Sequence, residues 1–262
     1  MRTIKILGLL VCFIAIGLFF AAFVGLGDVL PKKNIARVEG EGFAVLELFT
    51  SEGCSSCPPA DQVLAKIEKE ADDKAVYLLA YHVDYWDRQG WKDSFSSADY
   101  SERQAQYGRW FNLSTIYTPQ LVVNGKKEFA GSDERAIRNA IVGELSAKPE
   151  ATLTLETTQR NEGLIVAYHA VGAIKGTDLL ITVVQKTGHS KVIRGENAGR
   201  ELSHVQIVRK LQVVELSGVG DGSAVITLPE DLNDQDWEIL GMIQNKNNGK
   251  ILGAAKAIIK KS

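Results

Sequence analysis

Hydrophobic positions in the first half of the chain alternate between continuous apolar runs and helically spaced ones. The runs at 43–50 and 75–82 are apolar almost throughout, which is typical of strands buried on both faces of a sheet. Between them, 60–71 carries apolar residues at helical spacing with acids and lysines on the other side. The first half therefore begins as a β–α–β unit, which implies parallel strands and a right-handed crossover.

The pattern then becomes aromatic and polar before regular elements return. Residues 83–113 form a long aromatic insertion, in which we expect a helix near 97–111. Asn124–Gly125 is a strong hairpin signal. We therefore predict strands at 120–124 and 126–129, then a helix from about 132 to 147.

After Pro149 the chain reads as strands separated by Gly, Asn and Asp, without convincing helices. Such regular strand spacing is typical of an antiparallel β-sandwich of the immunoglobulin-like kind. We expect a domain boundary within 148–150. The predicted strands are 152–158, 164–171, 178–186, 205–216, 223–229 and 237–245.

The N-terminus differs from both halves. Arg2 and Lys5 precede an uncharged run over 6–27, the order found in a secretory signal. The run is also long enough to span a bilayer, so a cleaved signal and a retained anchor both remain open. Either way the basic flank predicts that the protein lies outside the cytoplasm, periplasmic or secreted, and meets the membrane only through 1–27.

Net charge and cysteine count narrow the function classes. A net charge of −2 and a pI near 6.1 give no electrostatic footprint for nucleic acid. Outside the apolar run the only cysteines are Cys54 and Cys57. The pair can be a redox couple, a metal clasp or a structural staple. A loop of four residues stabilises little through chain entropy, which makes the staple the weakest account.

A strand leads into the CxxC and a helix follows, which favours redox chemistry. A thiolate near a helix N-terminus is stabilised by the helix dipole. We therefore expect an exposed Cys54 to act as the nucleophile and a more buried Cys57 as the resolving thiol. This couple needs no cofactor, and its partners would be protein thiol or disulfide clients or a redox partner.

Two further segments are candidates for the same site. Thr118–Pro119 opens a predicted strand; we expect a cis-proline loop that binds client peptide, the alternative being an ordinary trans proline at a strand start. The second strand ends at His82 and Asp84, and sites form at the carboxyl ends of parallel strands. His82 and Asp84 are therefore candidates for a proton relay, and Trp86 for a wall that contacts substrate. Alternatively, these aromatic and polar residues pack a lid onto the domain and do not contact substrate.

Other polar residues give weaker indications. The loop at 194–200 is rich in charge and in glycine, and is either a plain polar loop or an interface with the first domain or a partner. His169, His189 and His204 are far apart in sequence and give no metal spacing. Two thiolates and His82 could hold copper(I). The pattern does not supply the four ligands that a structural zinc site requires.

Several motifs together resemble a known family. The segments LFTSEGCSSCPPAD at 48–61, YHVDYWD at 81–87, GWKD at 90–93, YTPQ at 117–120 and RGENAGR at 194–200 are similar to those of bacterial predicted secreted proteins with a thioredoxin-like domain, a family known mainly as a domain of unknown function. The resemblance implies a fold and a family but no substrate.

Taken together, the sequence predicts an α/β thioredoxin-like domain at 43–148, after a linker at 28–42, and an all-β sandwich domain at 149–262. The predicted function is that of an exported thiol–disulfide oxidoreductase. A non-enzymatic extracytoplasmic binding protein with a structural or regulatory CxxC, and a copper(I) carrier, remain as alternatives.

Overall fold

The computed structural model describes residues 42–71, 74–160, 163–172, 175–216, 220–229 and 236–260. The predicted signal or anchor at 1–27 lies outside these residues, as does nearly all of the predicted linker. No helix in the described ranges has both the length and the apolar character needed to cross a membrane.

The first half builds four strands of a sheet around β1 (Ala44–Thr50), all of whose residues are buried. β2 (Val76–His82) pairs with β1 in parallel, and β3 (Gln120–Val123) pairs with it on the other side in antiparallel. β4 (Lys127–Ala130) closes the hairpin with β3 and forms the edge of the sheet. The continuous apolar run of β1 therefore lies at a position covered on both faces.

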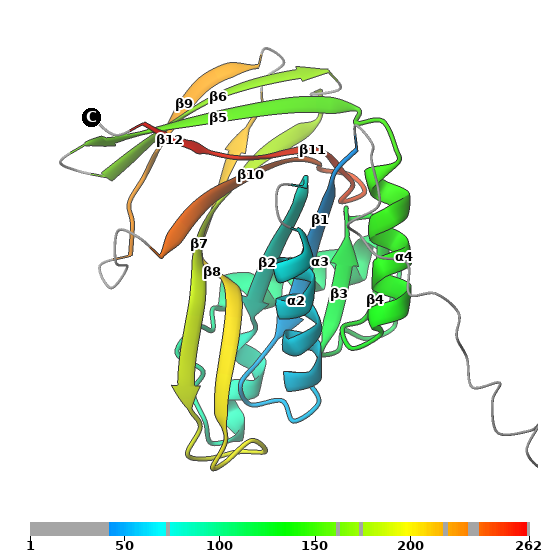
Figure 1. Ribbon diagram of the computed structural model, residues 1–262, viewed down its shortest axis with the longest axis vertical. Helices are drawn as coiled ribbons and strands as arrows, with labels where there is room; N and C mark the ends of the chain where they lie inside the picture. The colour runs from blue at the N-terminus through cyan, green and yellow to red at the C-terminus, as the bar shows by residue number, and fades with distance from the viewer. Residues whose placement is uncertain are drawn as a thin grey trace, which may run out of the picture. The chain divides into compact units, whose positions relative to one another are not determined.

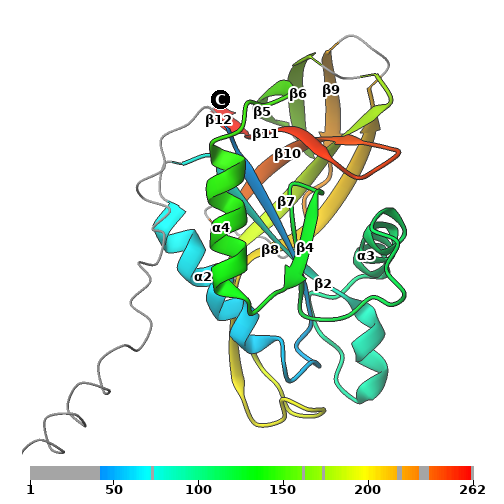
Figure 2. The same cartoon turned by 90° about the vertical axis from the view of Figure 1, so that its right-hand side faces the viewer.

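Helices cover both faces of these strands (Figure 2). α2 (Pro58–Ala71) and α4 (Glu134–Leu145) share one hydrophobic core with β1 and β3, built from residues such as Leu64, Ile137 and Leu46. The short 3-10 helix η2 (Asp84–Gln89) and α3 (Ala98–Trp110) lie on the opposite face, where Tyr107 packs against Phe49. Both ends of α2 are thereby fixed against the sheet.

In the second half, every regular element of the described residues is a strand. They are β5 (Ala151–Arg160), β6 (Gly163–Gly172), β7 (Thr177–Lys191), β8 (Glu201–Glu215), β9 (Asp221–Ile226), β10 (Trp237–Asn245), β11 (Ile251–Lys256) and β12 (Ile258–Lys260). Four of them form a small sheet in the order β12-β5-β6-β9. This sheet packs through Leu153, Leu155 and Val166 onto inward residues of β7 and β10.

The predicted fold class, an α/β thioredoxin-like domain followed by a separate sandwich, is wrong. Four strands of the second half do not form a separate sheet. They are β7, β8, β10 and β11. They continue the sheet of the first half, in the order β11-β10-β7-β8-β2-β1-β3-β4 (Figure 1). Over the residues that the structure describes, the protein is instead mostly β, with one large mixed sheet of eight strands and a second sheet of four.

The joint between the halves is the pairing of β8 with β2. The two strands run parallel and share one register pair, Ala80 with Ile207. Since β2 would otherwise end the sheet with unpaired backbone groups, β8 covers an edge that a separate domain would have left open. The large sheet therefore contains strands from both sides of residues 148–150.

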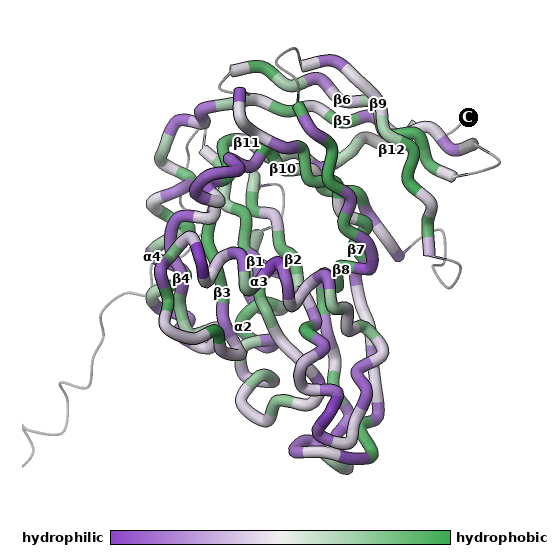
Figure 3. The backbone as a smooth tube through the Cα atoms, turned by 180° about the vertical axis from the view of Figure 1, so that it is seen from behind, coloured by the Kyte–Doolittle hydropathy of each residue, from purple (hydrophilic) through white to green (hydrophobic). Residues whose placement is uncertain are grey.

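β7 and β8 reach beyond this joint as a long two-stranded hairpin. Their pairing continues to Lys191 with Glu201, past the predicted strand end at 186. The loop at the tip is largely hydrophilic, whereas the central strands are largely hydrophobic (Figure 3). The hairpin carries its polar tip to the carboxyl ends of β1 and β2, where the CxxC lies.

Candidate functional site around the Cys54–Cys57 disulfide

Cys54 and Cys57 form a disulfide where β1 passes into α2. Their Cα atoms are 5.4 Å apart, within the range of ordinary disulfides. Cys57 directly precedes the helix, and its carbonyl accepts the N–H of Asp61. Pro58 and Pro59 occupy the first two helical positions, where a missing N–H costs no helical hydrogen bond. The dithiol pair is thereby placed at the positive end of the α2 dipole.

The expected difference in exposure between the two cysteines is not found. Both residues are 0% exposed, whereas the intervening Ser55 and Ser56 are exposed. Cys54 Sγ lies 3.3 Å from the Ser56 hydroxyl, which can donate a hydrogen bond to sulfur. The prediction of an exposed Cys54 is therefore wrong.

The loop at the tip of the β7–β8 hairpin covers the CxxC backbone. Nδ2 of Asn197 donates to the carbonyl oxygens of Glu52 and Cys54, both at 2.9 Å. The Ser55 N–H donates to Oε2 of Glu196 at 3.0 Å. Hydrogen bonding to Ser55 lowers the pKa of the Glu196 carboxyl below its ordinary value. Of the two alternatives for 194–200, the contacts favour an interface with the first half.

The Thr118–Pro119 loop lies beside the same disulfide. The peptide bond between the two residues is cis, as expected from the sequence. Thr118 O is 3.5 Å from the Ser56 hydroxyl, and the Thr118 hydroxyl accepts Nε1–H of Trp86 at 2.8 Å. The fold thus brings together Trp86, Thr118, Pro119 and the CxxC, although 62 positions separate Ser56 from Thr118.

His82 is fully buried at the carboxyl end of β2 and is paired with Asp93. Its Nδ1 lies 2.7 Å from Oδ2 of Asp93, an oxygen that also accepts the Glu52 N–H at 2.9 Å. Burial alone would lower the pKa of His82, but the Asp93 carboxylate raises it above its ordinary value. Burial would likewise raise the pKa of Asp93, but His82 holds it below its ordinary value. The pair therefore favours imidazolium and carboxylate together.

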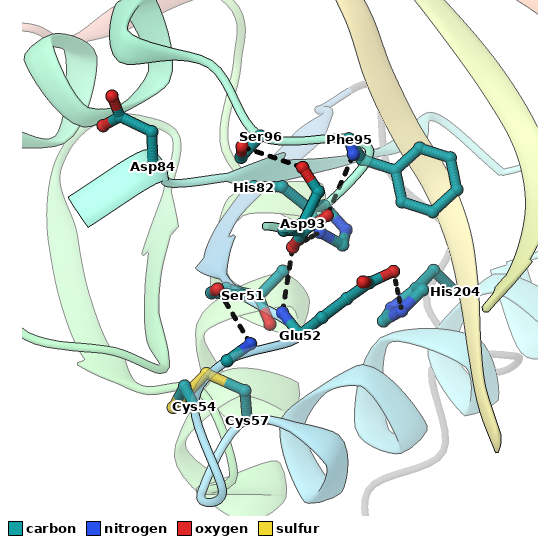
Figure 4. Close-up of polar contacts among 12 residues, drawn as sticks. Ser51, Glu52, Cys54, Cys57, His82, Asp84, Asp93, Phe95, Ser96 and His204 are labelled. Atoms are coloured by element: carbon teal, nitrogen blue, oxygen red, sulfur yellow. Dashed lines mark hydrogen bonds and ion pairs between the residues drawn. A yellow bond between two sulfur atoms is a disulfide. The ribbon is translucent and has the colours of Figure 1, made fainter. Parts of the chain in front are cut away.

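Asp84, the predicted partner of His82, lies elsewhere. Its backbone N–H and its carboxylate both bond the Ser101 hydroxyl at the start of α3. Figure 4 shows its side chain well apart from His82 and Asp93. Asp84 thus ties η2 to α3, and the acid that contacts His82 comes from further along the insertion.

A second histidine completes a buried cluster next to the disulfide. His204, on β8, stacks edge-on against His82 with ring centroids 4.7 Å apart. Its Nε2 lies 3.7 Å from Oε1 of Glu52, and its Nδ1 lies 3.5 Å from Oδ2 of Asp61. These separations allow ion pairing when the imidazolium form is present, but they are too long for good hydrogen bonds. Figure 4 shows Glu52 reaching from the CxxC loop toward His204.

Several polar atoms of this cluster make no hydrogen bond within the part of the chain that the structure describes. They are Oε1 of Glu52, Nε2 of His82 and both ring nitrogens of His204. The other carboxylate oxygen of Glu52 accepts Nε1–H of Trp91 at 2.7 Å. Buried polar atoms without partners are costly, and a bound water, an ion or a role in catalysis can account for them.

Sequence reasoning missed His204 and gave no role to Asp93. His204 lies 122 positions after His82, and no local pattern relates the two. One signal was available for Asp93, because it lies within the aromatic insertion that begins at the end of β2. Among the described residues no group of three or more His, Cys, Asp and Glu side chains could hold a metal ion.

A cavity of about 410 Å³ lies away from this site. It is lined by side chains of α3, β7, β8 and β10, among them Arg103, Trp110 and Leu180. None of the predicted site residues lines it, so we place the candidate site at the disulfide.

Comparisons with known proteins indicate a family and a fold. The family described as "Protein of unknown function (DUF1223)" matches residues 45–244. A comparison with curated proteins finds no match.

Two solved structures resemble the chain over most of its length. A crystal structure of a protein from Agrobacterium tumefaciens is 25% identical with a TM-score of 0.65, covering 86% of this chain and 98% of that one. HBP35 of Porphyromonas gingivalis is 19% identical with a TM-score of 0.60, covering 86% and 78%. The second likeness speaks for a shared fold alone.

Proposed function

The chain belongs to the DUF1223 family of proteins of unknown function, and we propose that it exchanges thiols and disulfides through Cys54 and Cys57. The observation that carries the proposal is a CxxC disulfide at a helix N-terminus beside the Thr118–Pro119 loop. A helix dipole and a nearby hydroxyl both favour the thiolate, which is the reactive form of cysteine.

The exchange proceeds in two balanced steps. In the oxidising direction a client thiolate attacks Sγ of Cys54, and Cys57 leaves as a thiolate. A second client thiolate then attacks the client sulfur of the mixed disulfide and releases Cys54. The client loses two electrons and gains a disulfide, while the CxxC pair takes up the two electrons. The reducing direction is the reverse, and a redox partner of the opposite kind restores the pair.

The Thr118–Pro119 loop is the proposed client-binding shelf. Trp86 donates a hydrogen bond of 2.8 Å to the Thr118 hydroxyl. This bond fixes the Thr118 side chain and so restrains the backbone of the loop. Gly53 supports this arrangement, because a Cβ there would lie 3.1 Å from Cβ of Trp86. A client segment laid along this loop would pass the sulfur of Cys54.

The buried cluster is the proposed proton reservoir of the exchange. Full reduction of the disulfide takes up protons as well as electrons, and a buried thiolate without a proton donor is costly. Glu52 stands two residues before Cys54 and connects, through Asp93 and His204, to both imidazoles. Asp93 takes the position at His82 that the sequence assigned to Asp84.

Location and partners remain part of the proposal. The basic and then apolar order of residues 1–27 supports export to the periplasm or beyond, where disulfides persist. The partners would be protein thiols, protein disulfides and a redox partner. The two thiols supply the electrons themselves, so the proposed reaction needs no cofactor.

One observation favours a second candidate, a binding protein in which the disulfide is structural. Both cysteines are 0% exposed under the hairpin tip, as expected for a staple. The short loop opposes this candidate, because closing four residues stabilises a fold only slightly. Turnover separates the two candidates.

The test is catalysis in both directions. The full chain should accelerate either the reduction of insulin by dithiothreitol or the oxidation of reduced ribonuclease A by glutathione disulfide. Cys54→Ser should abolish the acceleration, and Cys12→Ser, the matched control, should leave it unchanged. A folded protein that accelerates neither reaction would exclude the exchange function and leave the structural disulfide.

A further inference from the structure

The loop at 192–200, between β7 and β8, is a small unit held by its own hydrogen bonds. Backbone bonds join Val192 N to Arg200 O and Gly199 N to Val192 O. The Arg200 guanidinium also donates to Oδ1 of Asn197 at 2.8 Å, which orients the amide of that side chain. We call this unit the tip.

The tip is joined to the CxxC segment by few but specific bonds. Asn197, itself 0% exposed, donates twice from one amide nitrogen, and Glu196 accepts once from Ser55. The three CxxC groups involved are the carbonyls of Glu52 and Cys54 and the N–H of Ser55. All three are backbone groups, of the kind that a bound peptide uses for hydrogen bonding.

The arms of the β7–β8 hairpin place the tip several residues beyond the pairing of β8 with β2. β8 shares a single register pair with β2, at Ile207, while the last pair within the hairpin is Lys191 with Glu201. Between these points β8 is bonded to β7, and its buried His204 packs against His82 of the first half. The tip can therefore separate from the CxxC segment without breaking the pairing between the two halves of the sheet.

The outer side of the tip faces solvent with an apolar residue. Ile193 is 66% exposed, and Arg194 beside it is exposed as well. The same loop thus presents an apolar side chain and a basic one outward while its Asn197 amide is bound inward. The outer side is therefore accessible to a protein partner while the inner side bonds the CxxC segment.

We propose that the tip is a cap over the Cys54–Cys57 disulfide, and that a protein partner presenting a thiol or disulfide must displace it. The cap rests on the proposed function, since it governs access to the same sulfurs. Both cysteines are 0% exposed, and the tip occupies backbone groups beside them that a client segment would use. Asn197 is a positioning residue of this device and does not touch the sulfurs through any bond described above.

The test compares the rate at which dithiothreitol reduces the native disulfide in the full chain. Asn197→Asp keeps the acceptor for Arg200 but removes both donated bonds, and Asn197→Ala removes all three. Each should raise the rate about tenfold or more, since two lost hydrogen bonds correspond to at least about 1.4 kcal/mol of opening free energy. Glu196→Ala, on an exposed side chain, should give a smaller rise of about two- to fivefold.

Controls separate the cap from a general loss of stability and from the proposed function. Asn139→Ala, on the exposed face of α4, should leave the rate unchanged. Urea unfolding of each variant identifies any rate rise that comes from global unfolding. Exchange with reduced ribonuclease A is measured on the same proteins.

Each outcome decides one claim. Equal dithiothreitol rates in wild type, the Asn197 variants and Glu196→Ala would overturn the cap, whatever the exchange with ribonuclease A. Faster dithiothreitol rates without any exchange with ribonuclease A would keep the cap as a cover and overturn the exchange function. Faster rates in both assays support the two proposals together.

Discussion

The side-chain amide of Asn197 donates to the carbonyl oxygen of Cys54 at 2.9 Å, across 143 positions of the chain. This bond joins the all-β half of the protein to the helix-bearing half at the CxxC. The site is therefore composite: β1 and α2 supply the sulfurs, the aromatic insertion supplies Asp93, and the β7–β8 hairpin supplies the cover. Removing either half would leave it incomplete.

The first prediction concerns the Trp86 bond to Thr118. Trp86→Phe keeps an aromatic ring but removes the donor to the Thr118 hydroxyl, and so loosens the proposed shelf. Exchange with reduced ribonuclease A should slow about two- to tenfold, the value of one hydrogen bond, while reduction by dithiothreitol should not change. Both rates are measured by quenching the reaction at set times with an alkylating reagent and quantifying the products by mass spectrometry.

Trp110→Phe, in the cavity beside α3, is the matched control for this change. It should alter neither rate. An equal slowing in both assays by Trp86→Phe would assign the tryptophan a role in holding the disulfide loop and not in binding client.

The second prediction is a pH window for the His82–Asp93 pair. The raised pKa of His82 means that its stabilisation is complete below about pH 6.5 and is lost as the pH rises through the folded-state pKa. The lowered pKa of Asp93 means that its stabilisation is complete above about pH 3.8 and is lost as the pH falls through the folded-state pKa. The pair should stabilise the fold most between these values.

Urea unfolding of wild type and Asp93→Asn from pH 3 to pH 9 measures this window. The difference in unfolding free energy should be largest near pH 5 and smaller at both ends. His169→Gln, which alters an exposed pair with Asp221, should show little such dependence. A difference for Asp93→Asn that stays constant across the range would contradict the pairing.

The third prediction concerns the buried ion pair that anchors α3. Nε of Arg103 donates to Oε2 of Glu47 at 2.6 Å, and Glu47 is 0% exposed. Arg103→Met should cost about 3–5 kcal/mol of unfolding free energy, because it leaves a buried carboxylate without its cation. Arg109→Met, which breaks an exposed pair with Glu102 on the same helix, should cost less than about 1 kcal/mol. Similar losses of unfolding free energy for the two variants would show that burial does not determine how much the Arg103–Glu47 pair stabilises the fold.

The fourth prediction tests the contact between the β3–β4 turn and the β10–β11 turn. Gly125 has φ +60°, and a Cβ there would collide with the carbonyl of Gly249. Gly125→Ala should therefore destabilise the protein by about 2 kcal/mol or more. Gly143→Ala, in α4 with nothing near its Cβ position, should instead stabilise by up to about 1 kcal/mol. Equal effects on urea unfolding would mean that the two turns are not packed as described.

Local pattern predicted much of the first half. The apolar runs at 43–50 and 75–82 became β1 and β2 within a residue or two, because burial on both faces leaves a signal independent of the rest of the chain. The helix at 60–71 was also found, starting two residues early at Pro58. Turn chemistry likewise placed the β3–β4 hairpin.

Long-range pairing could not be predicted in the same way. The distal arms of β7 and β8 contain Gly188 and exposed polar residues, so their extension past residue 186 has no apolar signature. The joint of β8 with β2 rests on a single register pair. The strand at 251–256 was missed too, because Gly253, Ala254 and Ala255 have weak strand character. The strand at 258–260 was missed because three residues are too few to show a periodic pattern.

The residues of the candidate site show the same difference between local motifs and long-range contacts. Cys54, Cys57 and the Thr118–Pro119 loop stood out because their local motifs have few other uses. His204, Asp93 and Asn197 acquire their places from contacts between distant segments, and Asp84 was paired with His82 only because the two are close in sequence. The bonds from the tip to the CxxC backbone likewise join segments that no local pattern relates.

Trapping of mixed disulfides by Cys57→Ser tests the central claim most directly. Without the resolving thiol, Cys54 should remain covalently bound to client proteins when the full chain is expressed in its native compartment. The account predicts reductant-sensitive complexes on gels, identified by mass spectrometry, that disappear in the Cys54→Ser, Cys57→Ser double variant. A folded Cys57→Ser protein that yields no covalent complex, even with Asn197→Asp added to open the cap, would contradict it.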